Sequence, residues 1–541
     1  MKKVNLVPGV FPVLCLFTSL SGAPSTDPWV DGELIEFKQN GAWCWFQDER
    51  AVVDTVEKKL IIGSTGSGSG SIDVTIYDLE EKKIESSTQV GNLSSDDHNA
   101  PALLIRPDGN YLAMFADHYD RYNSHYSICD NGHWSYEKKF DWQKTEGFDG
   151  EPIAYSNLFY LAAEGRTYDF ARANNQTPNF LFSEDYGDTW KFGGRLSTDP
   201  SSTYNKGYYK YWSNGVDRID FCNTQQHPRD TPTSIYHGFI KDGKTHNSFG
   251  EVVDGNVYDI EDLPTKDDFT TVFANDTVVK GMKMTRCWQS DICRYEDSTI
   301  AILFKARADN SEFDHRNFYA RFDGDQWQCT YIGKAGKPMY SAEEDYTGLG
   351  ALCPDDPNTI YISSPFNPGD DDSEEGKREI WRGITGDHGK TWEWSPVTAN
   401  STQDNFRPIV PKWNVKNTAL LWFRGEYTKA QEFTTNVVGV LYHHAVETES
   451  LQKRNPVTGK ALSLAGRSHR SITLRYSVPD NANTSLRVFS LSGKCMATLV
   501  NRNTAAGTYA ICWNTESVSK GIYLCMLNTG RFSRTMTVEV W

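Results

Sequence analysis

The side chains best suited to chemistry lie between residues 40 and 175. This stretch contains histidine, tyrosine and arginine, which transfer protons or bind anionic groups near neutral pH. The chain has no Ser-His-Asp elbow, HExxH helix, phosphate-binding loop or dinucleotide-binding glycine pattern. The informative segments are GAWCWFQDER at 41–50, DHNAPAL at 97–103, ADH at 116–118, YSN at 155–157 and YDFAR at 168–172.

These segments belong to a chain with strand-like patterning. Short apolar runs bounded by Gly, Asn, Asp and Pro recur along it, whereas helical periodicity is scarce. Aromatic residues make up 13%, and the 42 Gly and 22 Pro residues are typical of turn-rich β proteins. The sequence therefore predicts an all-β fold. The expected strands include 59–63, 71–77, 102–105, 111–115, 299–304, 359–363 and 419–423.

Two eight-residue segments, 183–190 and 385–392, share the pattern S/T-x-D-x-G-x-T-W, the Asp box of sialidase-like propellers. We expect its Asp to cap a tight turn, its Gly to supply a positive φ, and its Trp to pack between neighbouring sheets, with no catalytic role. Segments 130–134 and 323–327 are shorter relatives. The separation of the two full segments fits about four propeller blades.

Charge and composition exclude several classes of partner. The 541 residues include 71 Asp and Glu against 55 Lys and Arg, which gives a net charge of −16. This charge argues against nucleic acid and anionic membrane surfaces. After the N-terminus, no segment approaches the roughly 20 apolar residues that span a bilayer. The cysteines form no CxxC pairs, and Cys287 and Cys293 either form a local disulfide or stay buried thiols.

The sequence divides into four expected segments. Residues 1–23 combine a basic start, an apolar stretch and small residues, as in a signal peptide, so we expect an exported protein. Residues 24–447 are expected to form a β-propeller, 448–470 a linker, and 471–541 a small β-sandwich. The tail resembles the FlgD-like sorting domains of exported bacterial enzymes that use type IX secretion, which would place the protein outside the cell or on its surface. A carbohydrate-binding or spacer module is the alternative.

The order of these segments resembles the BNR-4 group of seven-bladed β-propellers. This group includes ulvan lyases, rhamnose-glucuronate lyases and a related α-L-rhamnosidase family. The resemblance spans residues 30–445 and implies a seven-bladed β-propeller followed by the small C-terminal β-sandwich. It continues through YTGLG at 346–350, DPNTIYIS at 356–363, NFRP at 405–408 and LWFRGEY at 421–427.

In lyases of this group two histidines, a tyrosine and an arginine form the catalytic cluster, and the matching positions here are His98, His118, Tyr155 and Arg172. β-Elimination removes the weakly acidic C5 proton of a uronic acid, so the adjacent carboxylate must be neutralised, a task that suits Arg172. Tyr155 and one histidine would transfer protons, while the other histidine would bind the carboxylate or orient its neighbour. The alternative is that the histidines are structural, Tyr155 a core residue and Arg172 a salt-bridge partner.

Other residues are candidates for binding. Arg316, Arg407 and His237 are expected to contact the substrate, although Arg407 could instead brace a blade. Some ulvan lyases of this fold hold a structural zinc through His and Cys, and the acidic run 370–372 is either a calcium loop or a solvated loop. The histidines considered for zinc are His227, His237 and His246.

The resemblance and these residues predict a secreted polysaccharide lyase that cleaves an ulvan-like, uronic-acid-containing polysaccharide by β-elimination. It would act as a monomer on an anionic polysaccharide and need no cofactor for the chemistry. Because the net charge repels anionic polymers, we expect a basic patch around Arg172. An α-L-rhamnosidase-type hydrolase and a non-catalytic glycan-binding propeller are the alternatives. The aromatic segment 204–212 either rims the glycan cleft or packs within an insertion.

Overall fold

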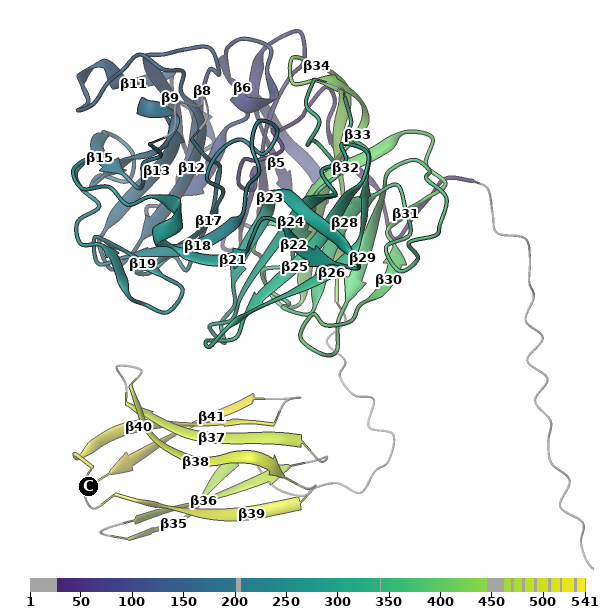
Figure 1. Ribbon diagram of the computed structural model, residues 1–541. Helices are drawn as coiled ribbons and strands as arrows, with labels where there is room; N and C mark the ends of the chain where they lie inside the picture. Colours follow the sequence, from purple (N-terminus) through teal and green to yellow (C-terminus); the bar gives the residue numbers. More distant parts are fainter. Residues whose placement is uncertain are drawn as a thin grey trace, which may run out of the picture. The chain divides into compact units, whose positions relative to one another are not determined.

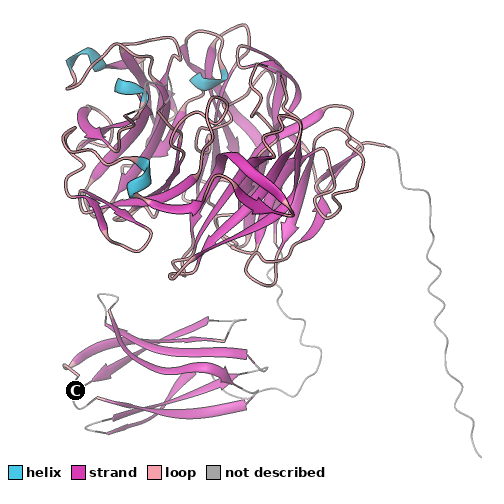
Figure 2. Cartoon of the chain, viewed as in Figure 1, coloured by secondary structure: helices cyan, strands magenta, loops and turns pink. Residues whose placement is uncertain are grey.

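The computed structural model describes residues 27–200, 206–340, 342–444, 462–468, 471–478, 482–490, 494–504, 507–515, 518–529 and 533–540. The expected signal peptide, residues 1–23, lies outside these ranges. The chain divides into two compact units, Met1–Ala445 and Val446–Trp541. The all-β prediction is confirmed, since helix in the described ranges is limited to single 3-10 turns (Figure 2). These turns are η1 (Asp97–Asn99), η2 (Trp142–Lys144), η3 (Asn174–Gln176) and η4 (Lys266–Asp268).

The first unit is built from consecutive antiparallel sheets, which Figure 1 shows one after another around the unit. The first sheet contains β3 (Ala51–Asp54), β4 (Lys59–Thr65), β5 (Ser71–Asp78) and β6 (Lys83–Asn92). The second contains β7 (Ala102–Ile105), β8 (Tyr111–Ala116), β9 (Asn123–Asp130), β10 (His133–Trp134) and β11 (Lys138–Asp141). The third contains β12 (Ala154–Leu161), β13 (Arg166–Arg172), β14 (Pro178–Ser183) and β15 (Lys191–Arg195).

Four further sheets complete this unit in the described residues. The fourth contains β16 (Tyr209–Ser213), β17 (Ile219–Asn223), β18 (Ile235–Lys241), β19 (Lys244–Asn247), β20 (Val252–Asp254) and β21 (Thr270–Phe273). The fifth contains β22 (Thr277–Val279), β23 (Met282–Arg294), β24 (Ile300–Ala308), β25 (His315–Phe322) and β26 (Trp327–Gly336). The sixth contains β27 (Gly350–Leu352), β28 (Thr359–Ser364), β29 (Glu379–Ile384) and β30 (Glu393–Pro396). The seventh contains β2 (Ile35–Lys38), β34 (Glu432–His443), β33 (Asn417–Lys429) and β32 (Asp404–Ile409).

One strand of each sheet contacts a strand of the next, in the order β3, β7, β12, β16, β23, β27 and β32. We call these the inner strands. The start of the unit joins its end, because β2 pairs with β34 and the N–H of Gly41 donates to the carbonyl of Thr435 at 2.9 Å. A separate two-stranded pairing joins β1 (Trp29–Val30) to β31 (Thr398–Ala399).

The expected strands are confirmed: each of the seven predicted ranges falls in a strand whose ends shift by only a few residues, apart from 419–423, which is the middle of the longer β33. Their alternating apolar residues are buried in the sheets because successive side chains point to opposite faces. Aromatic rings fill the centre, where Phe46 and Trp288 stack at 3.4 Å between centroids. Cys287 and Cys293 are free and buried, so the disulfide alternative is wrong.

The two eight-residue repeats form tight turns of the expected geometry. Asp185 accepts hydrogen bonds from the N–H and hydroxyl of Thr189 at 2.9 and 2.6 Å, and Asp387 accepts the same pair from Thr391 at 2.9 and 2.7 Å. The glycines of the two segments have φ of +98° and +86°. Each tryptophan packs against a tyrosine of the preceding sheet, Trp190 on Tyr126 and Trp392 on Tyr319.

The second unit has two antiparallel sheets that share one apolar core (Figure 1). One contains β35 (Leu462–Ser468), β36 (Ser471–Val478) and β39 (Gly507–Asn514). The other contains β38 (Cys495–Thr504), β37 (Ala482–Ser490), β40 (Gly521–Asn528) and β41 (Ser533–Val540). β35 lies inside the range expected as linker, 448–470, and pairs with β36. Residues 462–468 therefore belong to the sheet and not to the linker. In the described ranges, no helix has the length and apolar character to cross a membrane.

Candidate active site

The four residues carried over by resemblance, His98, His118, Tyr155 and Arg172, come together at one edge of the second and third sheets. His98 lies in η1, just before β7, and His118 follows the end of β8. Tyr155 lies at the start of β12 and Arg172 at the end of β13. Because neighbouring strands are antiparallel, the start of one and the end of the next share an edge. We call these four residues the catalytic-edge cluster.

A single buried carboxylate holds both histidines. Asp96 has no exposed surface, and its two oxygens lie 2.6 Å from Nδ1 of His98 and 3.2 Å from Nδ1 of His118. The two imidazole rings stack in parallel at 4.0 Å. The Gln431 amide also donates to Asp96, at 2.6 Å. The sequence analysis missed Asp96, although it directly precedes the motif that contains His98.

Arg172 links the second histidine to the tyrosine. Its Nη2 lies 3.1 Å from Nε2 of His118, and its guanidinium lies 4.8 Å from the ring centroid of Tyr155. The ring of Tyr208 is 6.0 Å from the same guanidinium. A cation is therefore held among aromatic faces and a histidine, at a site where a carboxylate ligand could take bidentate hydrogen bonds.

Tyr155 is held in a strained backbone conformation. Its φ is +64°, and the pairing of β12 with β13 is interrupted between Ala154 and Asn157. This irregularity costs about 1–3 kcal/mol at a non-glycine residue, and such strain gathers at functional sites. The Tyr155 hydroxyl lies 3.9 Å from the Cys44 sulfur, and its ring centroid 5.2 Å from that of His98.

The electrostatics make the two histidines different. Burial opposes charge on His98, but Cys44 and Tyr155, followed by Asp96 and Asp97, outweigh burial and raise the pKa of His98 well above the usual value. Burial and the charge of His98 lower the pKa of His118 to about 4. Burial would raise the pKa of Asp96, yet both imidazoles hold it well below its usual range. Burial raises the pKa of Tyr155 well above its usual value. At neutral pH, His98 is therefore an imidazolium, His118 is neutral and Tyr155 is a phenol.

The protonation states agree with the hydrogen bonds. A neutral His118 donates its Nδ1–H to Asp96 and accepts an N–H of Arg172 at Nε2. An imidazolium at His98 donates its Nδ1–H to Asp96 at 2.6 Å and forms an ion pair with Asp97, whose oxygen lies 2.8 Å from the same nitrogen. Tyr427 donates to the other oxygen of Asp97 at 2.7 Å. This edge of the sheets thus holds one neutral base, His118, and two proton donors, the His98 imidazolium and the Tyr155 hydroxyl.

Arg407 does not reach this edge. It has no exposed surface, and its guanidinium donates to the backbone carbonyls of Gln47, at 2.6 Å, and Cys44, at 3.4 Å. The Gln47 amide in turn donates to the carbonyl of His98 at 2.6 Å. The expected substrate contact is corrected to the bracing alternative: Arg407 supports the loop that positions His98.

Arg316 and His237 also lie apart from the cluster. Arg316 pairs with Asp314 at 2.9 Å and contacts none of the four residues. His237 is fully buried, with Nδ1 2.9 Å from Ser248 and Nε2 3.3 Å from Asp220. The sequence predicts that both contact the substrate, but Arg316 pairs with Asp314 and the His237 ring lies between Ser248 and Asp220. Both contacts are therefore corrected to structural roles.

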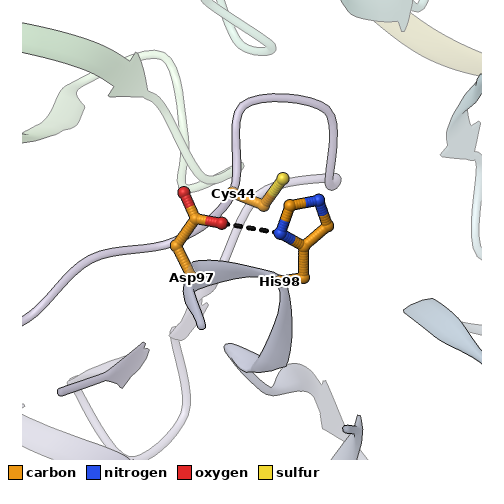
Figure 3. Close-up of side chains that lie close together, drawn as sticks. All are labelled: Cys44, Asp97 and His98. Carbon is orange, nitrogen blue, oxygen red and sulfur yellow. Dashed lines mark ion pairs between the residues drawn. The ribbon is translucent and has the colours of Figure 1, made fainter. Parts of the chain in front are cut away.

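The structure offers two groups of potential metal ligands among the described residues, and both contain His98. One is Cys44, Asp97 and His98 (Figure 3), and the other is Asp96, His98 and His118. Nδ1 of His98 already faces both carboxylates directly, so the imidazolium itself is the cation they surround. Neither group includes the histidines considered for zinc or the acidic run 370–372, where Asp371 pairs with Lys280 at 2.7 Å.

Only part of the aromatic segment 204–212 lies beside the four clustered residues. Tyr208 packs against Tyr155, with centroids 5.9 Å apart, and against His227, at 5.2 Å. Tyr211 instead packs inside the sheets against Phe170 at 4.5 Å. Tyr204 lies outside the described residues. Tyr208 and Tyr211 are both buried, so these two residues support the packing alternative, Tyr208 beside Tyr155 and Tyr211 within the sheets.

Comparison with solved structures identifies proteins of similar fold. No family model and no curated protein matches the chain. Among solved structures, the chain is similar to an ulvan lyase, from a new family of polysaccharide lyases, bound to -[GlcA(1-4)Rha3S]-, with TM-score 0.55 and 12% identity over 75% of this chain and 95% of that one. A second structure of such an ulvan lyase gives TM-score 0.53 and 11% identity, with the same coverage. At these identities the likeness shows the fold: the chain has a polysaccharide lyase-like, β-rich architecture.

Proposed function

We propose that this protein is an exported polysaccharide lyase whose first unit is a seven-bladed β-propeller. The blade count is supported by the seven consecutive sheets of four or more strands formed by the described residues between 35 and 444. Pairing of β2 with β34 supports ring closure, because it joins the start of the unit to its last sheet. The two Asp-centred turns are Asp boxes in this proposal.

The observation that carries the proposed reaction is Arg172 between a neutral His118 and the phenol of Tyr155. Arg172 binds the carboxylate of a uronic acid and so stabilises negative charge that develops when C5 loses its proton. His118 takes this proton at Nε2 after Arg172 turns from that nitrogen to the substrate carboxylate, with Asp96 accepting the Nδ1–H of His118. The electron pair forms the C4–C5 double bond, the C4–O bond breaks, and the Tyr155 hydroxyl donates a proton to the leaving oxygen.

His98 has a supporting role in this reaction. As an imidazolium it balances Asp96 and Asp97, so that the carboxylate behind His118 stays ionised without an uncompensated buried charge. Its charge also keeps His118 neutral. The division left open by the sequence is therefore resolved in our proposal as His118 for proton abstraction and His98 for orientation.

An ulvan-like, rhamnose-uronate polysaccharide is the proposed substrate. Support comes from the similarity of fold to ulvan lyases and from the place of the Arg172 guanidinium between His118 and Tyr155. We further propose that the reaction needs no cofactor, that the chain works as a monomer, and that the second unit is a sorting domain that directs export.

The hydrolase alternative has weaker support. Most glycoside hydrolases need two carboxyl groups flanking the scissile bond. The carboxylates that contact the histidines of the cluster, Asp96 and Asp97, have no exposed surface and face His98. A purely binding propeller would have no use for a strained tyrosine that is joined to a neutral histidine through an arginine.

The test compares ulvan with ulvan whose uronic acids have been reduced to neutral sugars, using the ultraviolet absorbance of unsaturated uronate. We expect absorbance to rise with native ulvan only, because Arg172 requires a carboxylate. Arg172→Lys should retain some activity and Arg172→Ala should lose about a hundredfold or more. Equal cleavage of both polymers would contradict the proposal.

A further inference from the structure

A cavity of about 530 Å³ lies along the inner strands, farther toward their C-terminal ends than the catalytic-edge cluster. Its wall includes residues of β3, β7, β12 and β16, and the loop that follows β32. Tyr155 begins β12, whereas this cavity is lined by 157–160 of the same strand. Its volume is that of a site for a small molecule or a short segment of a glycan.

The walls of this cavity combine aromatic and apolar surface. Tyr160, Trp212 and Trp413 line it and are all half-buried, so part of each ring remains accessible. Val52, Leu104 and Val410 add aliphatic surface. Indole and phenol rings stack well on the C–H faces of sugar rings.

The polar lining of the cavity is balanced in charge. Two carboxylates, Asp48 and Glu49, and two cations, Arg50 and Lys412, line it. Arg50 is engaged with Ser156 and Asn157, while Lys412 is exposed at the loop. A lining of mixed charge favours neither an anion nor a cation strongly, whereas carboxylates are strong acceptors for sugar hydroxyls.

Asp48 has a buried oxygen that a bound ligand could satisfy. The side chain is 6% exposed, and its Oδ2 has no hydrogen-bond partner in the described part of the chain. Oδ1 accepts from the N–H of Tyr211 at 3.1 Å, and Lys210 stands 3.9 Å from it, beyond hydrogen-bond distance. A buried acceptor without a partner costs free energy, which a donor from a bound molecule or water would recover.

We propose that this cavity is a second carbohydrate site, which binds an uncharged sugar and takes no part in the elimination. The ring of the sugar stacks on Trp413 and Trp212, and its hydroxyls donate to Asp48 and Glu49. Its preference is thus opposite to that of the catalytic-edge cluster, where Arg172 selects a carboxylate.

The test measures binding of L-rhamnose, D-xylose and D-glucuronate to the full chain by isothermal titration and saturation-transfer NMR. We expect both neutral sugars to bind more tightly than D-glucuronate. Trp413→Ala should weaken their binding about tenfold, and Trp413→Phe should restore most of it. Glu49→Gln is a milder second variant, expected to weaken binding several-fold.

Arg172→Ala is the matched control at the other site and should leave binding of the neutral sugars unchanged. Trp413→Ala should in turn leave the initial rate of ulvan cleavage unchanged, which separates this site from the proposed lyase reaction. The inference is overturned if wild-type protein binds neither neutral sugar, if D-glucuronate binds as tightly, or if Arg172→Ala removes the binding that Trp413→Ala retains.

Discussion

At the scale of single residues, one carboxylate sets the chemistry of two histidines. Asp96 contacts both imidazoles, and because only one of them can be charged at low cost beside it, His98 is protonated and His118 is not. Stacking at 4.0 Å increases this difference, since two adjacent imidazolium ions repel each other. The asymmetry supplies a base near neutral pH without a metal in the proposed steps.

Replacing Tyr155 with Phe removes the hydroxyl that protonates the leaving oxygen. We expect the rate of elimination to fall about 10²–10⁴-fold while the affinity for ulvan oligosaccharides stays within a few-fold, because the ring and its contact with Arg172 remain. Absorbance kinetics and calorimetric binding measure the two quantities. An equal loss of both would identify Tyr155 as a structural residue.

The pH dependence of the rate follows from the two histidines. His118 must be neutral and His98 protonated, so activity should rise as pH increases through about 4, stay level near neutral pH, and fall again where His98 loses its proton, well above its usual pKa. Asp96→Asn removes the charge that helps to hold the proton on His98, so the pKa of His98 should fall and the alkaline limb should move to lower pH. Initial rates over a pH series test this shift. An unchanged profile in the Asp96→Asn variant would contradict the role assigned to Asp96.

At the scale of elements, tight turns fix how neighbouring sheets pack. Gly389 and Gly324 both have positive φ, +86° and +108°, but their surroundings differ. A Cβ at Gly389 would lie 2.2 Å from the Tyr319 ring, whereas one at Gly324 would meet nothing within 4 Å. The first turn therefore packs against the preceding sheet and the second faces open space.

This pair separates backbone strain from packing. Gly324→Ala should lower the free energy of unfolding by roughly 1–2 kcal/mol, the cost of a left-handed conformation in alanine. Gly389→Ala should cost roughly 1–3 kcal/mol more, because Tyr319 must also move. Urea denaturation of the full chain measures both. Equal losses would show that the contact with the preceding sheet contributes nothing.

At the scale of the whole molecule, the first unit depends on joining its two ends. β2 completes the sheet of β32–β34, and Phe37 of β2 is 1% exposed and packs edge-on against Tyr77 at 5.2 Å. This strand thus connects the last sheet with the first. Its loss would leave the edge of β34 unpaired and open the core.

A chain that begins at Asn40 lacks this strand, whereas one that begins at Asp27 keeps it. We expect the shorter chain to lose at least about 3 kcal/mol in the free energy of unfolding, from the burial of Phe37 alone. Thermal and urea unfolding followed by tryptophan fluorescence compare the two. If both unfold at the same midpoint, closure through β2 does not stabilise the unit.

Much of this architecture could be predicted from the sequence, because strand alternation and the S/T-x-D-x-G-x-T-W turns are local patterns. The four residues of the catalytic-edge cluster could be proposed only through resemblance. Asp96 could not be predicted from the sequence, because its contacts with the His98 and His118 rings form only in the folded chain. The sequence predicts a substrate contact for Arg407 because it shows the charge of this residue, but it does not show that the side chain is fully buried. The strand 462–468 could not be predicted, because its sequence, LSLAGRS, is partly polar and its pairing with β36 is seen only in the fold.

The most direct test of the account measures, in one reaction with ulvan, the unsaturated uronate by ultraviolet absorbance and the new reducing ends by a colorimetric assay. β-Elimination makes one double bond for every bond it cleaves. We predict equal numbers of double bonds and new reducing ends for the wild-type protein, and initial rates of both about 10²–10⁴-fold lower for Tyr155→Phe. New reducing ends without absorbance would contradict the account and identify a hydrolase.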